Sequence, residues 1–381
     1  MEQVLDRSAI DAAELSDAVR RMLGEDDLSV REWHVECIHL PVNAGTCGVY
    51  RVTGSAQLQD RAVPWSMILK VAQLADGVQA SSDDPAHWNY WKREMLLYES
   101  GLLDDLPGVS APRCFGVVGE RNTGLLWLED VPGAVAAPWP LDRFYGVAYR
   151  LGILNGHYLT GNPPPSGDFL SRRWTEGFVA SWDPLRAAIP QLRNHPVLQQ
   201  AWPGNTLDRF THLLGEVETF YAVLNALPHT FCHLDVFHSN LMARPCDGGV
   251  EQIVLVDWSF AGMAPIGAEI APLVAASPIF SGEDASRMPE MEEATFEGYC
   301  DGLRDSGWDR DRRLARLGYL ASIAVRYGLI PCGVFATDDS AVTYLSRAAG
   351  KPIQQCIEEM SVMSRFLLDK GDEARALMAA L

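Results

Sequence analysis

Short apolar segments of alternating character dominate the first third of the chain. VECIHL, GVYRVTG and WSMILKVAQ lie within residues 35–73, are rich in β-branched and aromatic residues, and are separated by glycine and proline. RCFGVVGE and GLLWLEDV follow and end before Pro132. This pattern predicts an antiparallel sheet. Apolar residues at helical spacing predict one helix over residues 9–23 and another over residues 87–103.

Helical periodicity dominates the chain after residue 132. It covers LDRFYGVAYRLGILNGHYLTG, forms one amphipathic helix over residues 206–227, and resumes from about residue 284. One β-like insertion interrupts it: TFCHLDVFHSNLMAR, a turn at residues 245–249, and EQIVLVDWSF, which together predict a hairpin. We therefore predict an α+β chain with a small β-rich lobe over residues 1–131 and a larger helical lobe over residues 132–381.

Composition and charge narrow the classes of function. The chain has 381 residues, 48% of them hydrophobic, and a net charge of −19. Such an acidic chain is a poor partner for duplex nucleic acid or an anionic membrane, although it is compatible with cationic ligands. No secretory signal and no membrane-spanning stretch is expected. The eight cysteines form no C-x-x-C pair, which predicts reduced thiols in a cytoplasmic protein.

One segment, residues 233–257, carries polar residues at a spacing that suggests a functional site. His233, Asp235 and Asn240 follow the pattern H-x-D-x-x-x-x-N, and Asp257 comes directly after the apolar run IVLV. Asn240 and Asp257 supply the oxygen ligands that Mg²⁺ prefers, and Asp235 is then free to orient a nucleophile and accept its proton. The alternative is a turn whose polar side chains are satisfied locally.

HLDVFHSNLM and IVLVDWSFAG resemble the catalytic core of the aminoglycoside phosphotransferase and choline kinase-like family. The resemblance implies a two-lobe, protein-kinase-like fold that uses ATP and Mg²⁺. It also implies that Asp235 is the catalytic base, that His233 supports its loop, and that Asn240 and Asp257 hold the metal.

The same resemblance extends to the β-rich lobe. Lys70 ends the run SMIL and resembles the strand lysine that pairs with the α- and β-phosphates. Glu94 is its expected ion-pair partner, with Glu99 as the competing carboxylate. Gly45 and Thr46 lie in NAGTCGVY, which resembles the loop over the phosphates, although an ordinary hairpin turn fits these residues as well.

Two further segments resemble parts of the family. LEDVPG resembles the hinge between the lobes, where the Glu129 carbonyl and the Val131 N–H would contact adenine. GAEIA stands where relatives commonly have G-x-D-L-A, so Glu269 replaces an aspartate. This exchange adds one methylene and leaves open how tightly Glu269 braces the catalytic loop.

We therefore expect ATP-dependent transfer of the γ-phosphoryl group to a hydroxyl of a small molecule, such as an aminoglycoside, an amino alcohol or a sugar. A protein substrate is less compatible, since the D-W-S element leaves no room for a long activation segment. A catalytically idle nucleotide-binding scaffold and a nucleotidyl transferase are the alternatives. Nothing in the sequence indicates the oligomeric state.

Overall fold

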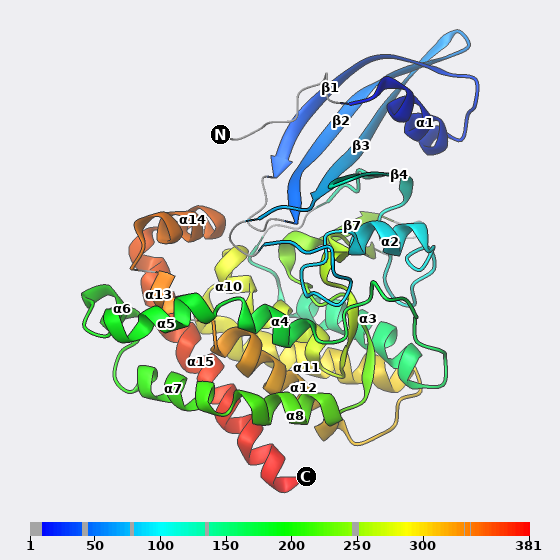
Figure 1. Ribbon diagram of the computed structural model, residues 1–381. Coiled ribbons are helices and arrows are strands. Elements are labelled where there is room, and N and C mark those ends of the chain that lie inside the picture. The colour runs from blue at the N-terminus through cyan, green and yellow to red at the C-terminus, as the bar shows by residue number, and fades with distance from the viewer. Residues whose placement is uncertain are drawn as a thin grey trace.

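A small lobe built on a sheet lies above a larger helical lobe (Figure 1). This is the α+β, two-lobe architecture expected from the sequence. The computed structural model describes residues 10–39, 45–76, 80–133, 137–245, 251–330, 332–335 and 337–381.

The small lobe contains a five-stranded antiparallel sheet in the order β1-β2-β3-β5-β4. Its strands are β1 (Ser29–His39), β2 (Thr46–Leu58), β3 (Arg61–Gln73), β4 (Cys114–Glu120) and β5 (Thr123–Glu129). Alternate residues of β2 and β3, such as Val52 and Met67, are fully buried, which is the period-2 pattern of a half-buried strand. The helix α1 (Ala12–Leu23) covers this apolar face through Leu15 and Val19.

The helix predicted over residues 87–103 is much shorter in the structure. Only α2 (Arg93–Glu99) is helical. The preceding residues form a compact loop, because the N–H groups of Ser82 and Trp91 bond to the carbonyls of Asn89 and Ser82 at 3.0 and 3.2 Å. These contacts use backbone groups that a longer helix would need for its own hydrogen bonds.

Two helices form the centre of the helical lobe, α3 (Leu141–Leu159) and α11 (Met288–Asp305), which pack along their length. A Cβ atom on Gly298 or Gly302 would lie within 2.3 Å of the Tyr145 or Tyr149 carbonyl, so only glycine permits this approach. The other helices are α4 (Trp174–Ala180), α5 (Asp183–Leu192), α6 (Pro196–Ala201), α7 (Thr206–Gly215), α8 (Val217–Ala226), α9 (Ala271–Ala275), α10 (Ser277–Phe280), α12 (Arg312–Ile323), α13 (Cys332–Phe335), α14 (Asp339–Ala349) and α15 (Ile353–Ala380).

The single helix predicted over residues 206–227 is two helices, α7 and α8. Glu216 separates them, with φ −108° and ψ 5°. Gly215 precedes the break, and glycine is a poor helix former because it loses more backbone entropy than other residues. The apolar pattern continues across the break, so periodicity alone does not reveal it.

The β-like insertion forms two small sheets rather than one hairpin. β7 (Leu241–Pro245) pairs with β8 (Glu251–Leu255), as predicted, and the turn residues 246–249 lie outside the described part of the chain. β6 (His229–Cys232) pairs instead with β9 (Gly262–Pro265), a strand that the sequence pattern did not indicate. The H-x-D-x-x-x-x-N segment therefore follows a strand of one sheet and precedes a strand of the other.

One apolar stretch is longer than the sequence analysis allowed. Arg312–Phe335 is long and apolar enough to cross a membrane, which corrects the expectation that no such stretch exists. Of its most apolar window, 94% is buried inside the helical lobe. Burial of this kind is the pattern of a core helix in a folded domain.

Candidate active site

Lys70, Glu94 and Asp257 meet at the junction of the lobes. Lys70 projects from β3 and is 5% exposed, and its Nζ lies 2.5 Å from Glu94 Oε2 and 2.7 Å from Asp257 Oδ1. The expected Lys70–Glu94 ion pair is thus present. Burial alone would raise the pKa of Asp257, but Lys70 and the Ser259 hydroxyl lower it to about 2. Glu99, the competing carboxylate, is exposed on the other side of α2.

The H-x-D-x-x-x-x-N segment is a tightly bonded loop after β6. The Asp235 N–H donates to His233 Nδ1 at 3.2 Å, so His233 Nε2 is the protonated atom that faces the Val256 carbonyl at 3.0 Å. Burial lowers the pKa of His233 to about 4, which keeps the imidazole neutral. His233 therefore ties the loop to the end of the neighbouring hairpin, a contact compatible with the supporting role that the family resemblance implies.

Asn240 and Asp257 are brought together by the hairpin between them. The Val256 N–H donates to the Asn240 carbonyl at 3.0 Å, directly before Asp257. Asp257 has φ 63°, an uncommon conformation for a residue other than glycine, and it turns its carboxylate from the strand towards the lobe junction, where it meets Lys70.

These residues fit a Mg²⁺ site of the kind that shares its ligands with substrate phosphates. The Asn240 amide nitrogen donates to Asp235 Oδ2 at 3.0 Å, so Asn240 Oδ1 is the remaining donor atom for a cation. The Asp257 side chain is 38% exposed and can reach a ligand. Among the described residues, no group of three or more His, Cys, Asp or Glu forms a complete metal site, so phosphate or water oxygens would have to complete the shell.

Glu269 braces the H-x-D-x-x-x-x-N loop through its backbone. It is fully buried, and its two oxygens accept the backbone N–H groups of His233 at 3.1 Å and Leu234 at 3.3 Å. Gly267, with φ 87°, allows the chain to approach α12, because a Cβ there would lie 2.2 Å from the Ala315 carbonyl. The glutamate side chain, one methylene longer than the aspartate common in relatives, thus bonds to both N–H groups of the loop.

We expect the pH dependence of stability to change in Glu269→Gln. Burial raises the pKa of Glu269 from its ordinary value to about 7. The native chain then holds a proton that the unfolded chain releases above about pH 4.3, so wild-type stability falls as pH rises towards 7. Glutamine does not titrate. The unfolding free energy of wild type minus that of the variant should fall by about 2 kcal/mol between pH 5.5 and 8. Urea unfolding across this range measures it, and a constant difference would contradict the prediction.

The chain between the lobes is anchored on both sides. Asp130 bonds to Arg51 Nε at 2.9 Å and to the Ser66 hydroxyl, both in the small lobe. The Gly133 carbonyl accepts the Ala243 N–H of the helical lobe at 3.2 Å. Val131 lies between these anchors and is partly buried.

Glu129, Gly45 and Thr46 are the remaining predicted site residues of the small lobe. Glu129, which ends β5, pairs with Arg244 of β7 at 2.6 Å and so connects the lobes through its side chain. Gly45 and Thr46 lie at the start of β2, where the Gly45 carbonyl accepts the Gln73 N–H at 3.0 Å. The expected phosphate loop also includes residues 43 and 44, which lie outside the described residues.

Sequence reasoning missed two buried arginines. Arg93 is fully buried and donates to the carbonyls of His87, Trp88, Phe169 and Ser259, so it joins α2 to the segment after Asp257. Arg326 contacts Asp235 at 3.0 Å. The only sequence signal for Arg326 is a charged residue inside the apolar run YLASIAVRYGLI, which requires a partner if it is buried.

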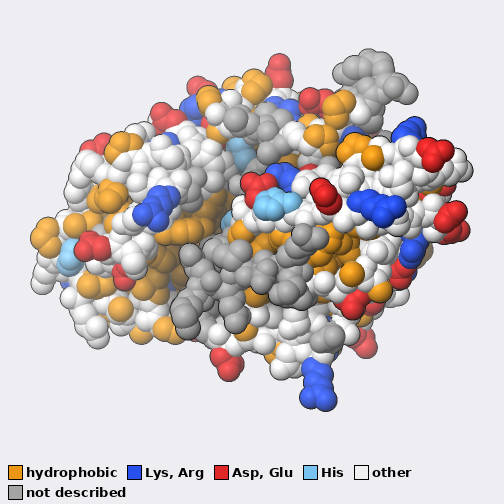
Figure 2. Space-filling model, turned by 90° about the horizontal axis from the view of Figure 1, so that it is seen from above, with side chains coloured by type: hydrophobic (Ala, Val, Ile, Leu, Met, Phe, Trp, Pro, Cys, Tyr) orange, Lys and Arg blue, Asp and Glu red, His pale blue; other side chains and the backbone are white. Residues whose placement is uncertain are grey.

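A cleft of about 1500 Å³ opens beside α4 and α5. Figure 2 shows hydrophobic side chains gathered in a hollow on the side where α5 and α13 lie in Figure 1. Trp182 and Phe335 meet edge to face in its wall, with ring centroids 5.4 Å apart. Three carboxylates line it. Glu176 bonds to Arg173 and Asn225, Asp338 caps α14, and Asp84 accepts the Ala86 N–H.

We expect Lys70→Met to lower kcat by at least about a hundredfold with the fold intact, because methionine keeps the apolar stem but removes the charge. Glu94→Gln should also lower kcat, since Glu94 holds Lys70. Glu99→Gln is the matched control on the same helix and should behave as wild type. Steady-state kinetics and thermal unfolding of the three variants test this, and a larger defect in Glu99→Gln than in Glu94→Gln would show that the ion-pair partner is misassigned.

The chain resembles known phosphotransferases both in sequence and in fold. The sequence model of the phosphotransferase enzyme family matches residues 92–314, more than half of the chain. No curated protein sequence matches significantly. The choline kinase structure from Cryptosporidium parvum Iowa II has a TM-score of 0.52 at 13% identity, covering 95% of this chain and 96% of its own. A structure of amicoumacin kinase hAmiN in complex with AMP-PNP, Ca²⁺ and Ami has a TM-score of 0.49 at 15% identity, covering 86% and 89%.

Proposed function

The chain belongs to the phosphotransferase enzyme family, and we propose that it transfers the γ-phosphoryl group of ATP to a hydroxyl group of a small molecule. The observation that supports this most directly is the position of Asp257. It contacts Lys70 of the small lobe, and the residue before it bonds to Asn240 of the catalytic loop. The groups that phosphoryl transfer requires therefore converge on one place at the lobe junction.

We assign the nucleotide to the junction between the lobes. Lys70 would bind the α- and β-phosphates, with Glu94 holding its ammonium group in place. The Glu129 carbonyl and the Val131 N–H would bind adenine, and Gly45 and Thr46 would lie over the phosphates. Asn240 and Asp257 would hold Mg²⁺, which when bound neutralises charge on the phosphate oxygens.

Asp235 is the residue proposed to act on the acceptor. Its carboxylate would accept a hydrogen bond from the acceptor hydroxyl, orient the oxygen towards the γ-phosphorus and take the proton as the new bond forms. Burial raises the pKa of Asp235 to about 6, against the opposing effect of Arg326. The carboxylate is therefore ionised, and able to accept a proton, in neutral solution.

The apolar cleft beside α4 and α5 is the proposed site for the body of the acceptor. It exceeds the roughly 300–1,000 Å³ of an ordinary small-molecule pocket, so it has room for a bulky acceptor, and Trp182 and Phe335 offer aromatic surface. The aromatic pair is the main apolar surface of this wall, so we propose that the acceptor presents an apolar face to Trp182 and Phe335. This refines the range of aminoglycosides, amino alcohols and sugars compatible with the sequence.

The test is an ADP-release screen with ATP and Mg²⁺ over hydroxylated compounds, including polycationic aminoglycosides, amino alcohols, sugars and neutral compounds with apolar rings. Acceptor-dependent ADP release that is lost in Asp235→Asn supports the proposal. Mass spectrometry of the product should show the addition of one phosphate. Addition of a nucleotide would show nucleotidyl transfer instead, and nucleotide binding without turnover on any acceptor would favour the idle scaffold.

A further inference from the structure

A buried arginine lies where α12 continues into a π-helical segment, Ala324–Gly328. Arg326 is 5% exposed. It lies beyond residues 92–314, so the family match assigns it no role. A buried guanidinium needs partners to offset its lost hydration, and π-helical segments occur frequently at functional sites. The partners of Arg326 are therefore informative about its role.

Arg326 holds one of the two carboxylate oxygens of Asp235. Its Nη2 donates to Asp235 Oδ1 at 3.0 Å, while Asn240 Nδ2 donates to Oδ2 at 3.0 Å. Two different side chains thus fix the plane of the carboxylate. Each oxygen of a carboxylate has a further lone pair, so the group can still accept a hydrogen bond from a hydroxyl.

The same guanidinium stabilises the backbone next to Asp235. Leu234 has φ 69°, a strained conformation for a leucine. Its carbonyl accepts a hydrogen bond from Arg326 Nη1, and its N–H donates to Glu269 Oε2 at 3.3 Å. Arg326 therefore holds the carbonyl of the strained residue and Glu269 holds its N–H. Together they fix the backbone conformation that orients the Asp235 side chain.

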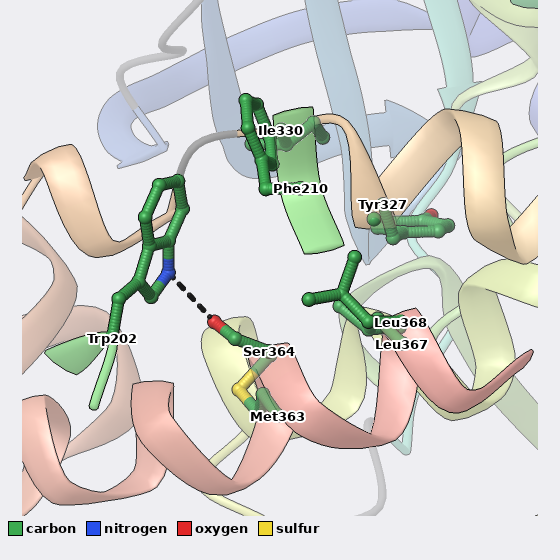
Figure 3. A pocket seen from close by; sticks show the side chains of 9 residues that line it. Trp202, Phe210, Tyr327, Ile330, Met363, Ser364, Leu367 and Leu368 are labelled. Carbon is green, nitrogen blue, oxygen red and sulfur yellow. Dashed lines mark hydrogen bonds between the residues drawn. The ribbon is translucent and has the colours of Figure 1, made fainter. Parts of the chain in front are cut away.

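Aromatic rings contact Arg326, and the C-terminal helix α15 packs against the segment that carries it. Its Cζ lies 4.2 Å from the ring centroid of Trp174, a cation–π distance. On the side of α15, Tyr327 lies near Leu367 and Leu368, as Figure 3 shows. The pocket between them is about 10 Å³, no larger than one water molecule, so the backing is close-packed.

We infer that Arg326 is a positioning residue that holds the Asp235 carboxylate in the orientation that accepts the acceptor hydroxyl. The inference rests on the proposed function, because it requires Asp235 to be the catalytic base. Arg326 acts through Asp235 and does not itself need to contact the reacting atoms. Its fork of donors can hold the Leu234 carbonyl and the Asp235 carboxylate together, which the single ammonium of a lysine cannot reproduce.

A double-mutant cycle distinguishes this role from a purely structural one. Arg326→Met in the wild-type background should lower kcat by about 10- to 100-fold, the range for a misplaced catalytic group, with the Kd for ATP changed less than about threefold. In the Asp235→Asn background, the same substitution should lower the residual kcat by less than about threefold, because the group that it positions is already lost. Arg326→Lys should lie between wild type and Arg326→Met.

Arg316→Met is the matched control. Arg316 lies on α12, pairs with Glu373 at 2.9 Å and covers the Phe296 ring at 5.0 Å. Its polar and ring contacts with described residues are on α11, α12 and α15, away from Asp235, so its loss should leave kcat unchanged. Thermal unfolding monitors the fold, and if Arg326→Met does not fold, Arg326→Lys carries the same cycle. Equal fold-losses in both backgrounds would overturn the inference about Arg326. Wild-type turnover of Asp235→Asn would instead overturn the assignment of the catalytic base.

Discussion

Asp235→Asn is expected to lower kcat by about two to four orders of magnitude, the usual range for loss of a general base. Asparagine keeps the size of the side chain and can still bond to Arg326 or Asn240, so the loop should retain its shape. It cannot take a proton from the acceptor hydroxyl. The Kd for ATP should change by less than about tenfold, because Lys70, Asn240 and Asp257 remain in place.

Two measurements on this one variant decide the role of Asp235. Acceptor-dependent ADP release reports turnover, and isothermal titration reports nucleotide affinity. If Asp235 only stabilised the turn, asparagine would serve equally well and turnover would survive. Near-normal turnover in a folded variant would therefore exclude Asp235 as the base.

Asp257→Ala should reduce turnover below detection and weaken nucleotide binding in the presence of Mg²⁺. Asp257 is the carboxylate proposed to bind the metal, and magnesium sites in phosphotransferases have few protein ligands to spare. Binding measured without Mg²⁺ should change much less. The fold should persist, because Lys70 keeps its ion pair with Glu94 after the second carboxylate is lost.

Ser259→Ala is the matched control for Asp257→Ala. The Ser259 hydroxyl donates to Asp257 Oδ1 at 2.6 Å, so its removal disturbs the same carboxylate without deleting it. We expect this variant to keep most of its turnover. Titrations with and without Mg²⁺ compare the two variants, and equal Mg²⁺-dependent affinity in Asp257→Ala and wild type would remove the metal assignment.

The proximity of the H-x-D-x-x-x-x-N segment to Asp257 could be predicted from sequence, because the contacts between them are local or follow a short hairpin. His233, Asp235 and Asn240 lie within one loop, and the hairpin β7–β8 brings Asp257 beside them. The strands of the small lobe were also predictable, since half-buried strands alternate in polarity. The Lys70–Glu94 pair required the family resemblance, because spacing alone left Glu99 as an alternative.

Other features depend on contacts that no local pattern records. Arg326 lies far from Asp235 in sequence, and the pairing of β6 with β9 joins two segments of four residues each, too short to show a period. The break between α7 and α8 interrupts the backbone but not the apolar pattern, so it was missed. In each case, contacts between segments that are distant in sequence decide the structure, and the local sequence pattern does not reveal them.

The anchors on either side of Val131 have a consequence for motion. Asp130 is bonded to the small lobe and Gly133 to the helical lobe, so along this connection a rotation of one lobe against the other would be taken up by Val131 and Pro132. The proline ring fixes one of their torsions, which leaves a narrow pivot. Adenine bound to Val131 would lie on the axis of this pivot, while the phosphates near Lys70 would lie further from it. Opening of the lobes would then separate the phosphates from Asp235 while the base stays bound, so that one end of the nucleotide is released before the other.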